Sequence, residues 1–294
     1  MSHYGETFRN FRLQKGYTMS QVAEGIVSIS FLSKFERGES EISLSLFVQL
    51  LDRLFISFDE FEFVHKNNTI SEMLRFFELS DEAYLNRDLK RLKILKGQQL
   101  DKWRETGIEP FRCNAIMINV YEGIIMEKES TAAAQDLQFL FDYLFKVEVW
   151  GYYELFLYNS TILLMEAEMV IHLSEIVYKN SEKLKQHKKL HEIILRIMLN
   201  TLIYLTGGAD PKFSYREECE RFFTYLDRIG IPEGDLSARN SVLYLRGVYL
   251  LRLGDWRAGS KLIEESIQTL KLLGARSTAK YQEDYYALLK EKFT

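Results

Sequence analysis

The chain has 294 residues, of which 47% are hydrophobic and 27% charged, so it is long enough for one or two domains with a buried core and is not disordered. Its formal net charge of −4 excludes a protein that is basic over its whole surface, although a small basic face that contacts DNA is compatible with it. Only 3 prolines and 16 glycines interrupt long stretches rich in Leu, Ile, Phe and Tyr, which favours an all-α fold over a many-turned β fold.

Residues 1–65 are predicted to form a domain of five short helices. Hydroxyl side chains typically begin helices and glycines end them, which sets the expected boundaries. The first expected helix contains Phe8 and ends at Gly16, and the second runs from Ser20 to Ile26 after Thr18. The third runs from Ser28 or Ser30 to Gly38, the fourth begins at Ser43, and the fifth begins at Ser57. Polarity rises over residues 65–68, which we expect to link this domain to a second one, residues 66–294.

The second and third helices have the residue order of two helices that meet at a steep angle. Ala23 is small enough for their crossing, and Val22, Ile26, Leu32 and Phe35 have the spacing of a shared core. The outward side of the third helix carries short hydroxyls and two cations, which suit base edges and phosphates in a major groove. The predicted DNA contacts are Arg9, Arg12 and Lys15 on the first helix, Gln21 on the second, and Ser28, Ser30, Ser33, Lys34 and Arg37 on the third.

The second domain is predicted to be an array of helical hairpins. Helices are expected at 70–84, 87–105, 111–128, 131–149, 152–169, 171–187, 189–206, 214–229, 235–253, 255–273 and 277–292. Equivalent features recur about every 40 residues, which is typical of helical repeats. The clearest unit, residues 245–266, resembles the tetratricopeptide pattern, with a glycine where two helices approach and an aromatic residue after the turn. We therefore predict a right-handed superhelical array.

Asparagines recur along this array at intervals of 40, 41 and 40 residues, at Asn119, Asn159, Asn200 and Asn240. Each lies on the first helix of an expected pair, and first helices of such a stack line its concave groove. A carboxamide has both a donor and an acceptor, so a row of them suits the amides of an extended peptide. Exposed asparagines without a role would give the same pattern.

Large apolar residues near these asparagines would form pockets for the side chains of a short apolar peptide. They are Phe156, Leu163, Tyr204 and Tyr244. Arg196 and Arg239 lie close to Asn200 and Asn240 in the sequence, and they are expected either to bind a peptide carboxylate or to have a structural or solvated role.

The front domain resembles the phage-repressor class of helix-turn-helix domains. Residues 32–40, LSKFERGES, followed by ISL at 42–44, closely resemble the Rgg family of Gram-positive transcriptional regulators, whose helix-turn-helix domain precedes a repeat domain of about this length. The resemblance implies a cytoplasmic, dimeric regulator whose repeat domain binds a short peptide pheromone, as in quorum sensing. It implies DNA contacts for Gln21, Ser33, Lys34 and Arg37 and, less directly, for Arg12.

Two alternatives remain open at this point. The repeat domain could instead bind a protein partner, with no peptide pheromone.

A homodimer is expected because helix-turn-helix proteins usually bind two half-sites of DNA through two-fold symmetry. The apolar end of the array, from Leu262 to Leu289, is either the dimer interface or the cap of the stack.

The sequence shows no sign of a membrane segment, a cofactor or a catalytic site. No apolar run reaches the roughly 18 to 20 residues of a spanning helix, and the first residues do not resemble a signal peptide, so we expect a cytoplasmic protein. Cys113 and Cys219 are predicted to be reduced, buried thiols. His187 and His191 lie four residues apart without further ligands at matching spacing. With no P-loop, dinucleotide-binding glycines or nucleophile elbow, we predict no metal, no cofactor and no enzyme.

Overall fold

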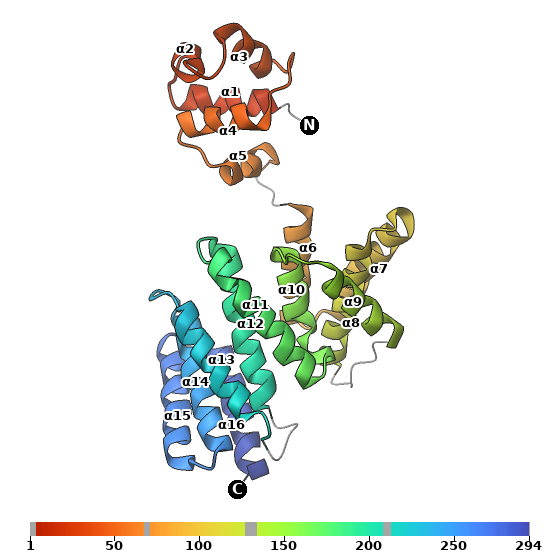
Figure 1. The fold of residues 1–294 in the computed structure, drawn as a ribbon, viewed down its shortest axis with the longest axis vertical. Helices are drawn as coiled ribbons and strands as arrows, with labels where there is room; N and C mark the ends of the chain where they lie inside the picture. The colour runs from red at the N-terminus through yellow and green to blue at the C-terminus, as the bar shows by residue number, and fades with distance from the viewer. Residues whose placement is uncertain (1–3, 68–70, 127–133, 208–212, 294) are drawn as a thin grey trace. The chain divides into compact units, whose positions relative to one another are not determined.

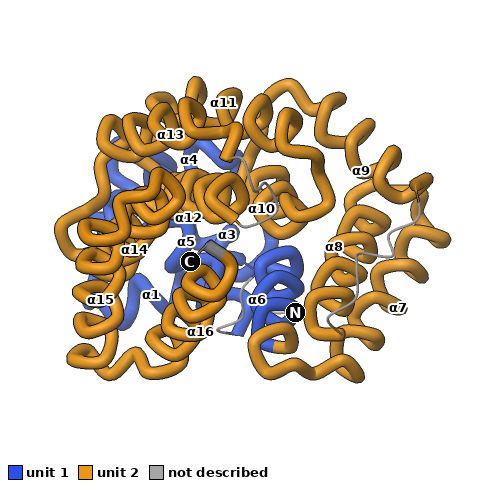
Figure 2. The backbone as a smooth tube through the Cα atoms, turned by 90° about the horizontal axis from the view of Figure 1, so that it is seen from below, with its two compact units in different colours: residues 1–82 blue, residues 83–294 orange. Residues whose placement is uncertain are grey.

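The computed structural model describes residues 4–67, 71–126, 134–207 and 213–293. All regular secondary structure in these ranges is helical, which confirms the predicted all-α class (Figure 1). The chain divides into two compact units, residues 1–82 and 83–294 (Figure 2). This division falls later than the boundary that we predicted after residue 65. None of the described helices has the length and apolar character needed to cross a bilayer.

Unit 1 contains five short helices and most of a sixth. They are α1 (Tyr4–Gln14), α2 (Met19–Ala23), α3 (Ile29–Glu36), α4 (Leu44–Arg53), α5 (Phe58–His65) and α6 (Glu72–Leu85). Helices α2 to α5 each begin after a hydroxyl side chain that accepts a hydrogen bond from a backbone amide three residues later, as predicted; these caps are Thr18, Ser28, Ser43 and Ser57. Helix α2 ends earlier than expected because Gly25 adopts a φ of 74° and turns the chain toward α3.

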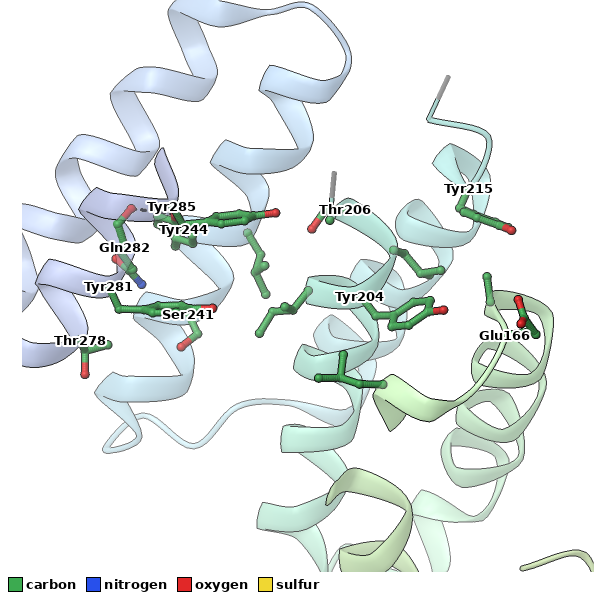
Figure 3. Close-up of a pocket in the computed structure, with 16 residues that line it drawn as sticks. Glu166, Tyr204, Thr206, Tyr215, Ser241, Tyr244, Thr278, Tyr281, Gln282 and Tyr285 are labelled. Carbon is green, nitrogen blue, oxygen red and sulfur yellow. Dashed lines mark hydrogen bonds between the residues drawn. The ribbon is translucent and has the colours of Figure 1, made fainter. Parts of the chain in front are cut away.

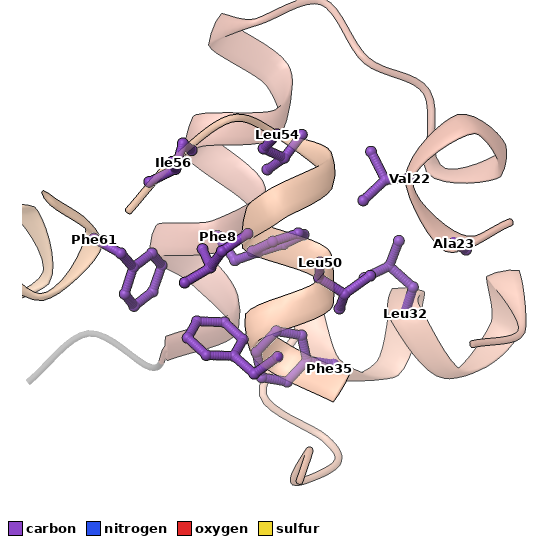
Figure 4. Close-up of a cluster of buried hydrophobic side chains, with 11 residues drawn as sticks. Phe8, Val22, Ala23, Leu32, Phe35, Leu50, Leu54, Ile56 and Phe61 are labelled. Atoms are coloured by element: carbon purple, nitrogen blue, oxygen red, sulfur yellow. The ribbon is translucent and has the colours of Figure 1, made fainter. Parts of the chain in front are cut away.

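The core of unit 1 gathers the apolar faces of α1 to α5 (Figure 4). Of the core predicted between the second and third helices, Val22, Leu32 and Phe35 are buried and Ile26 packs against them partly buried; Ala23, predicted at the crossing, is buried too. Helices α1 and α3 approach so closely that a Cβ atom on Gly5 would lie 1.8 Å from the carbonyl oxygen of Phe35. Only glycine fits at this contact.

Unit 2 contains the rest of the helices. They are α7 (Leu89–Thr106), α8 (Glu109–Ile125), α9 (Ala134–Lys146), α10 (Tyr152–Thr161), the 3₁₀ turn η1 (Ile162–Leu164), α11 (Ala167–Leu184), α12 (Lys188–Thr206), α13 (Arg216–Ile229), α14 (Leu236–Arg252), α15 (Trp256–Leu272) and α16 (Arg276–Phe293). Most predicted helices are confirmed. The helix expected over 152–169 is wrong at its end, because the chain tightens into η1 and Met165 is extended, so that α11 begins at Ala167.

Helices α8, α10, α12 and α14 pack against one another in succession and form an inner layer. Figure 2 shows α9, α11, α13 and α15 outside them. These four inner helices are the first helices of predicted pairs, so the array has the layering that the repeat predicts. Cys113 and Cys219 are buried free thiols, as expected.

Helices α14 and α15 make a very close contact through two glycines. A Cβ atom on Gly247 would lie 2.7 Å from Cγ1 of Ile263 and 2.9 Å from the carbonyl oxygen of Gly259. Gly97, in the middle of α7, has no atom within 4 Å of the equivalent position. The two helical glycines therefore differ only in what surrounds them.

We expect Gly247→Ala to lower the free energy of unfolding by about 1–3 kcal/mol, because the new methyl group forces α14 and α15 apart. Gly97→Ala should raise it by about 0.5–1 kcal/mol, because alanine is the better helix former. Urea unfolding followed by circular dichroism measures both. Equal stability of the two variants would contradict the glycine contact.

Candidate functional site

Helix α3 presents a polar face opposite its buried one. Ser30, Ser33, Lys34 and Arg37 follow the i, i+3, i+4, i+7 spacing of one helix side, and the structure leaves all but Ser33 exposed. Arg37 donates from Nη1 to Ser33 Oγ at 2.5 Å and from Nε to Glu39 Oε1 at 2.6 Å. This pairing lowers the pKa of Glu39. The structure thus brings four of the five predicted contacts of the third helix together on one surface.

Two other predicted DNA contacts also cap helices. Ser28 accepts the amide of Phe31 at the start of α3, and Gln21 Oε1 accepts the amide of Thr18 at the start of α2. Arg53, which the sequence analysis missed, donates to the carbonyl oxygens of Gln21 and Glu24 at 3.0 and 3.1 Å. Arg53 therefore fixes the turn between α2 and α3, and only the folded chain reveals this role, because 29 residues separate it from Glu24.

The prediction that Arg12 contacts DNA is wrong. Its side chain forms a two-pronged ion pair with Glu36, with Nε–Oε1 and Nη2–Oε2 distances of 2.6 and 2.7 Å, and also donates to the carbonyl oxygen of Tyr17. Only 4% of Arg12 is exposed. Residue 12 lies one turn after Phe8, on the buried face of α1. Arg9 and Lys15 are exposed, and their DNA contacts stay predictions.

The four asparagines of the row lie on the four inner helices of unit 2, but in different environments. Asn200 on α12 donates from Nδ2 to Asn159 Oδ1 on α10 at 2.9 Å. Asn119 on α8 accepts a hydrogen bond from Lys96, which also pairs with Glu122. The two central asparagines are therefore direct neighbours, whereas Asn119 belongs to a charged cluster.

Two predicted peptide contacts are wrong, and a third residue has the structural role that was its stated alternative. Asn240 is 6% exposed and donates to Ser266 on α15, because its position faces the second helix of the hairpin. Phe156 is 3% exposed and belongs to the core. Arg239 donates to the carbonyl oxygens of Ile231 and Pro232, so it stabilises the loop before α14. Arg196 is exposed one turn before Asn200, and its role stays a prediction.

A cavity of about 680 Å³ opens beside the inner layer of unit 2. Leu163, Tyr204 and Tyr244, all predicted from the sequence, line it. The hydroxyls of Tyr204 and Tyr244 donate to the carbonyl oxygens of Met165 and Gln282, so their rings rather than their hydroxyls are left to form the wall (Figure 3). Burial raises the pKa of both tyrosines, which stay neutral.

Helix α16 contributes the cavity residues that the sequence analysis missed. Tyr281, Gln282 and Tyr285 line one side of it (Figure 3). The sequence placed them at the apolar end of the array, as a dimer interface or a cap. No local pattern shows that the last helix reaches back to the cavity wall.

These features define a protein with a helix-turn-helix unit and a helical-repeat unit that carries a ligand-sized cavity. Residues 8–61 match a helix-turn-helix family, and residues 92–284 match the C-terminal domain of the HTH-type transcriptional regulator Rgg. The second match covers more than half of the chain, so the chain belongs to the Rgg family of transcriptional regulators. Membership agrees with the prediction of a DNA-binding regulator rather than an enzyme.

Solved structures share this architecture over the whole chain. The SHP pheromone receptor Rgg2 of Streptococcus dysgalactiae is 25% identical, with 97% of this chain and 99% of that chain covered and a TM-score of 0.81. A proposed transcriptional regulator of Listeria monocytogenes EGD-e is 24% identical, with 99% of both chains covered and a TM-score of 0.84. The PrgX/iCF10 complex is 16% identical, with 100% of this chain and 99% of that chain covered and a TM-score of 0.72. The Listeria protein and PrgX, at these identities, are similar to this chain in fold alone.

We expect Lys34→Ala and Arg37→Ala each to weaken binding to a specific DNA site by roughly tenfold or more, because each removes one contact to a base edge or phosphate. The probe is the duplex that the full-length chain enriches from random DNA, and fluorescence anisotropy measures the affinity. Lys188→Ala, an exposed cation of unit 2, is the control and should change nothing. Unchanged affinity in both unit 1 variants, with intact circular dichroism, would refute the assigned DNA-binding face.

Arg12→Met should destabilise unit 1 by about 3–5 kcal/mol, because it leaves the carboxylate of Glu36 buried without its partner. The double variant Arg12→Met, Glu36→Leu should recover most of that stability, since apolar residues can replace a buried ion pair. Thermal unfolding of the full chain measures both. A stable Arg12→Met protein that has lost only DNA binding would instead restore Arg12 as a DNA contact.

Proposed function

We propose that this Rgg-family regulator is a cytoplasmic homodimer that binds a short apolar peptide at the inner layer of unit 2 and changes its DNA binding in response. The observation that carries the proposal is the cavity next to the inner-layer helices, which also carry the Asn159–Asn200 pair. The comparisons support it, because Rgg2 is a pheromone receptor and PrgX was solved in complex with iCF10.

The asparagine pair suits the backbone of an extended peptide. The hydrogen bond between the two side chains uses a donor of Asn200 and the acceptor of Asn159. Nδ2 of Asn159 is then left to donate a hydrogen bond to a peptide carbonyl, and Oδ1 of Asn200 is left to accept one from a peptide N–H. Such contacts hold a chain without selecting its side chains, so selection falls to the cavity.

The size of the cavity favours a peptide over a whole protein as the partner. At about 680 Å³ it lies within the range of roughly 300–1,000 Å³ that is typical of small-ligand sites. Its walls come from η1, α11, α12, α14 and α16, so a ligand there contacts several helices at once. A ligand that binds one arrangement of these helices more tightly shifts the population toward it, which is how we expect the signal to reach the DNA-binding units of the dimer.

Asn159→Ala should weaken peptide binding by roughly tenfold, because two hydrogen bonds at the inner layer are lost. The probe is a pool of synthetic apolar heptapeptides, selected on the full-length chain and identified by mass spectrometry. DNA affinity without peptide should not change. Asn180→Ala is the matched control, because Asn180 lies on α11 and bonds to its own helix at Ile176.

Equal peptide affinity of Asn159→Ala and the unmodified chain would remove Asn159 from the site. If the unmodified chain retains no peptide but a folded protein binds unit 2, the alternative of a protein partner replaces the proposal. Enrichment of a two-fold symmetric DNA sequence from random duplexes is the test of the homodimer.

A further inference from the structure

The charge around the cavity is strongly one-sided. Among the described residues that line it, Glu166 is the only one with a formal charge, and the others are apolar, aromatic or neutral and polar. Glu166 is exposed, and it is the residue before α11, where the positive end of the helix dipole favours a carboxylate. Of the described lining residues, a charged group that enters this cavity therefore meets the carboxylate of Glu166.

A second carboxylate adds negative charge near Glu166. Glu168, two residues further along, accepts a hydrogen bond from the hydroxyl of Tyr215 at 3.2 Å, and Tyr215 lines the cavity. Both carboxylates lie close enough to Tyr204 to raise the pKa of its hydroxyl beyond the effect of burial. In Figure 3, Glu166, Tyr204 and Tyr215 lie together on one side of the cavity. Aromatic faces next to carboxylates are a favourable environment for a cation.

The described residues on the other side of the cavity are mostly aromatic, and none of those that line it has a formal charge. Tyr244, Tyr281 and Tyr285 lie there together (Figure 3). The side chain of Tyr244 is turned to the carbonyl oxygen of Gln282, and Tyr281 is 69% exposed although it is a large aromatic residue. Leu163, 56% exposed, also lines the cavity. Exposed apolar surface gathered in one concavity is typical of a binding site.

We propose that the peptide of this regulator presents a cationic group to Glu166 and a large apolar side chain to Tyr244, Tyr281 and Tyr285. The inference rests on the proposed peptide-binding function and deepens it. The cationic group is either the free amino terminus of the peptide or the side chain of a lysine or arginine. The sequence analysis considered only the opposite polarity, with arginines as candidate partners of a peptide carboxylate.

The test uses the full-length chain and four pools of synthetic heptapeptides with otherwise random apolar positions. The first pool has a free amino terminus, the second is acetylated, the third is acetylated with one lysine, and the fourth is acetylated with one glutamate. We expect the first or the third pool to be retained roughly tenfold better than the second, and the fourth to be retained least. The better of the two cationic pools identifies the source of the charge.

Glu166→Gln should abolish this preference, because it removes the charge and keeps the shape. Glu182→Gln, the same change at an exposed position of α11 outside the cavity, is the control and should keep the preference. Raising the salt concentration should narrow the preference in the unmodified chain, because screening weakens an exposed charge pair. Tyr281→Ala should reduce the share of aromatic and large aliphatic residues among the retained peptides.

Equal retention of all four pools, or a preference that persists in Glu166→Gln, would overturn this inference and leave peptide binding itself intact. Retention of none of the pools would overturn the proposed peptide-binding function, and the inference with it.

Discussion

The structure is governed by one constraint: most of the stability of a helix in a protein comes from packing its apolar face, so each helix must bury one face against its neighbours. What remains exposed after that burial is what can bind a partner. In unit 1, α3 buries Leu32 and Phe35 and leaves Lys34 and Arg37 outward. In unit 2, the inner helices pack in succession, and a cavity remains beside them. Both candidate sites are consequences of the same packing.

Close packing also requires particular residues where helices touch. Gly5 lets α1 approach the backbone of α3, and Gly247 and Gly259 let α14 and α15 approach each other. The buried ion pair of Arg12 and Glu36 joins the same two helices and sets their relative orientation as well as their separation. A guanidinium and a carboxylate must lie in line to offset the cost of their desolvation. Gly5 and this ion pair together hold the exposed face of α3 in a defined orientation.

Burial decides which residues of one chemical type are available to a ligand. Of the four asparagines in the row, Asn240 is bonded inside the α14–α15 hairpin, whereas Asn159 and Asn200 pair across two inner helices and keep a donor and an acceptor. Arginines divide in the same way. Arg12 is structural, Arg53 stabilises the turn between α2 and α3, and Arg37 remains on the surface.

The sequence by itself determined the helices, their caps and the resemblance to the Rgg family, because capping hydroxyls, helical periodicity and a contiguous motif are local properties of the chain. It also placed Asn159 and Asn200 on neighbouring inner helices through their spacing. Only the tertiary structure decided that Arg12 is buried, that Phe156 belongs to the core, and that Tyr281 and Tyr285 complete the cavity around Glu166. These outcomes depend on which helix faces meet, and contacts between residues far apart in the chain set those faces.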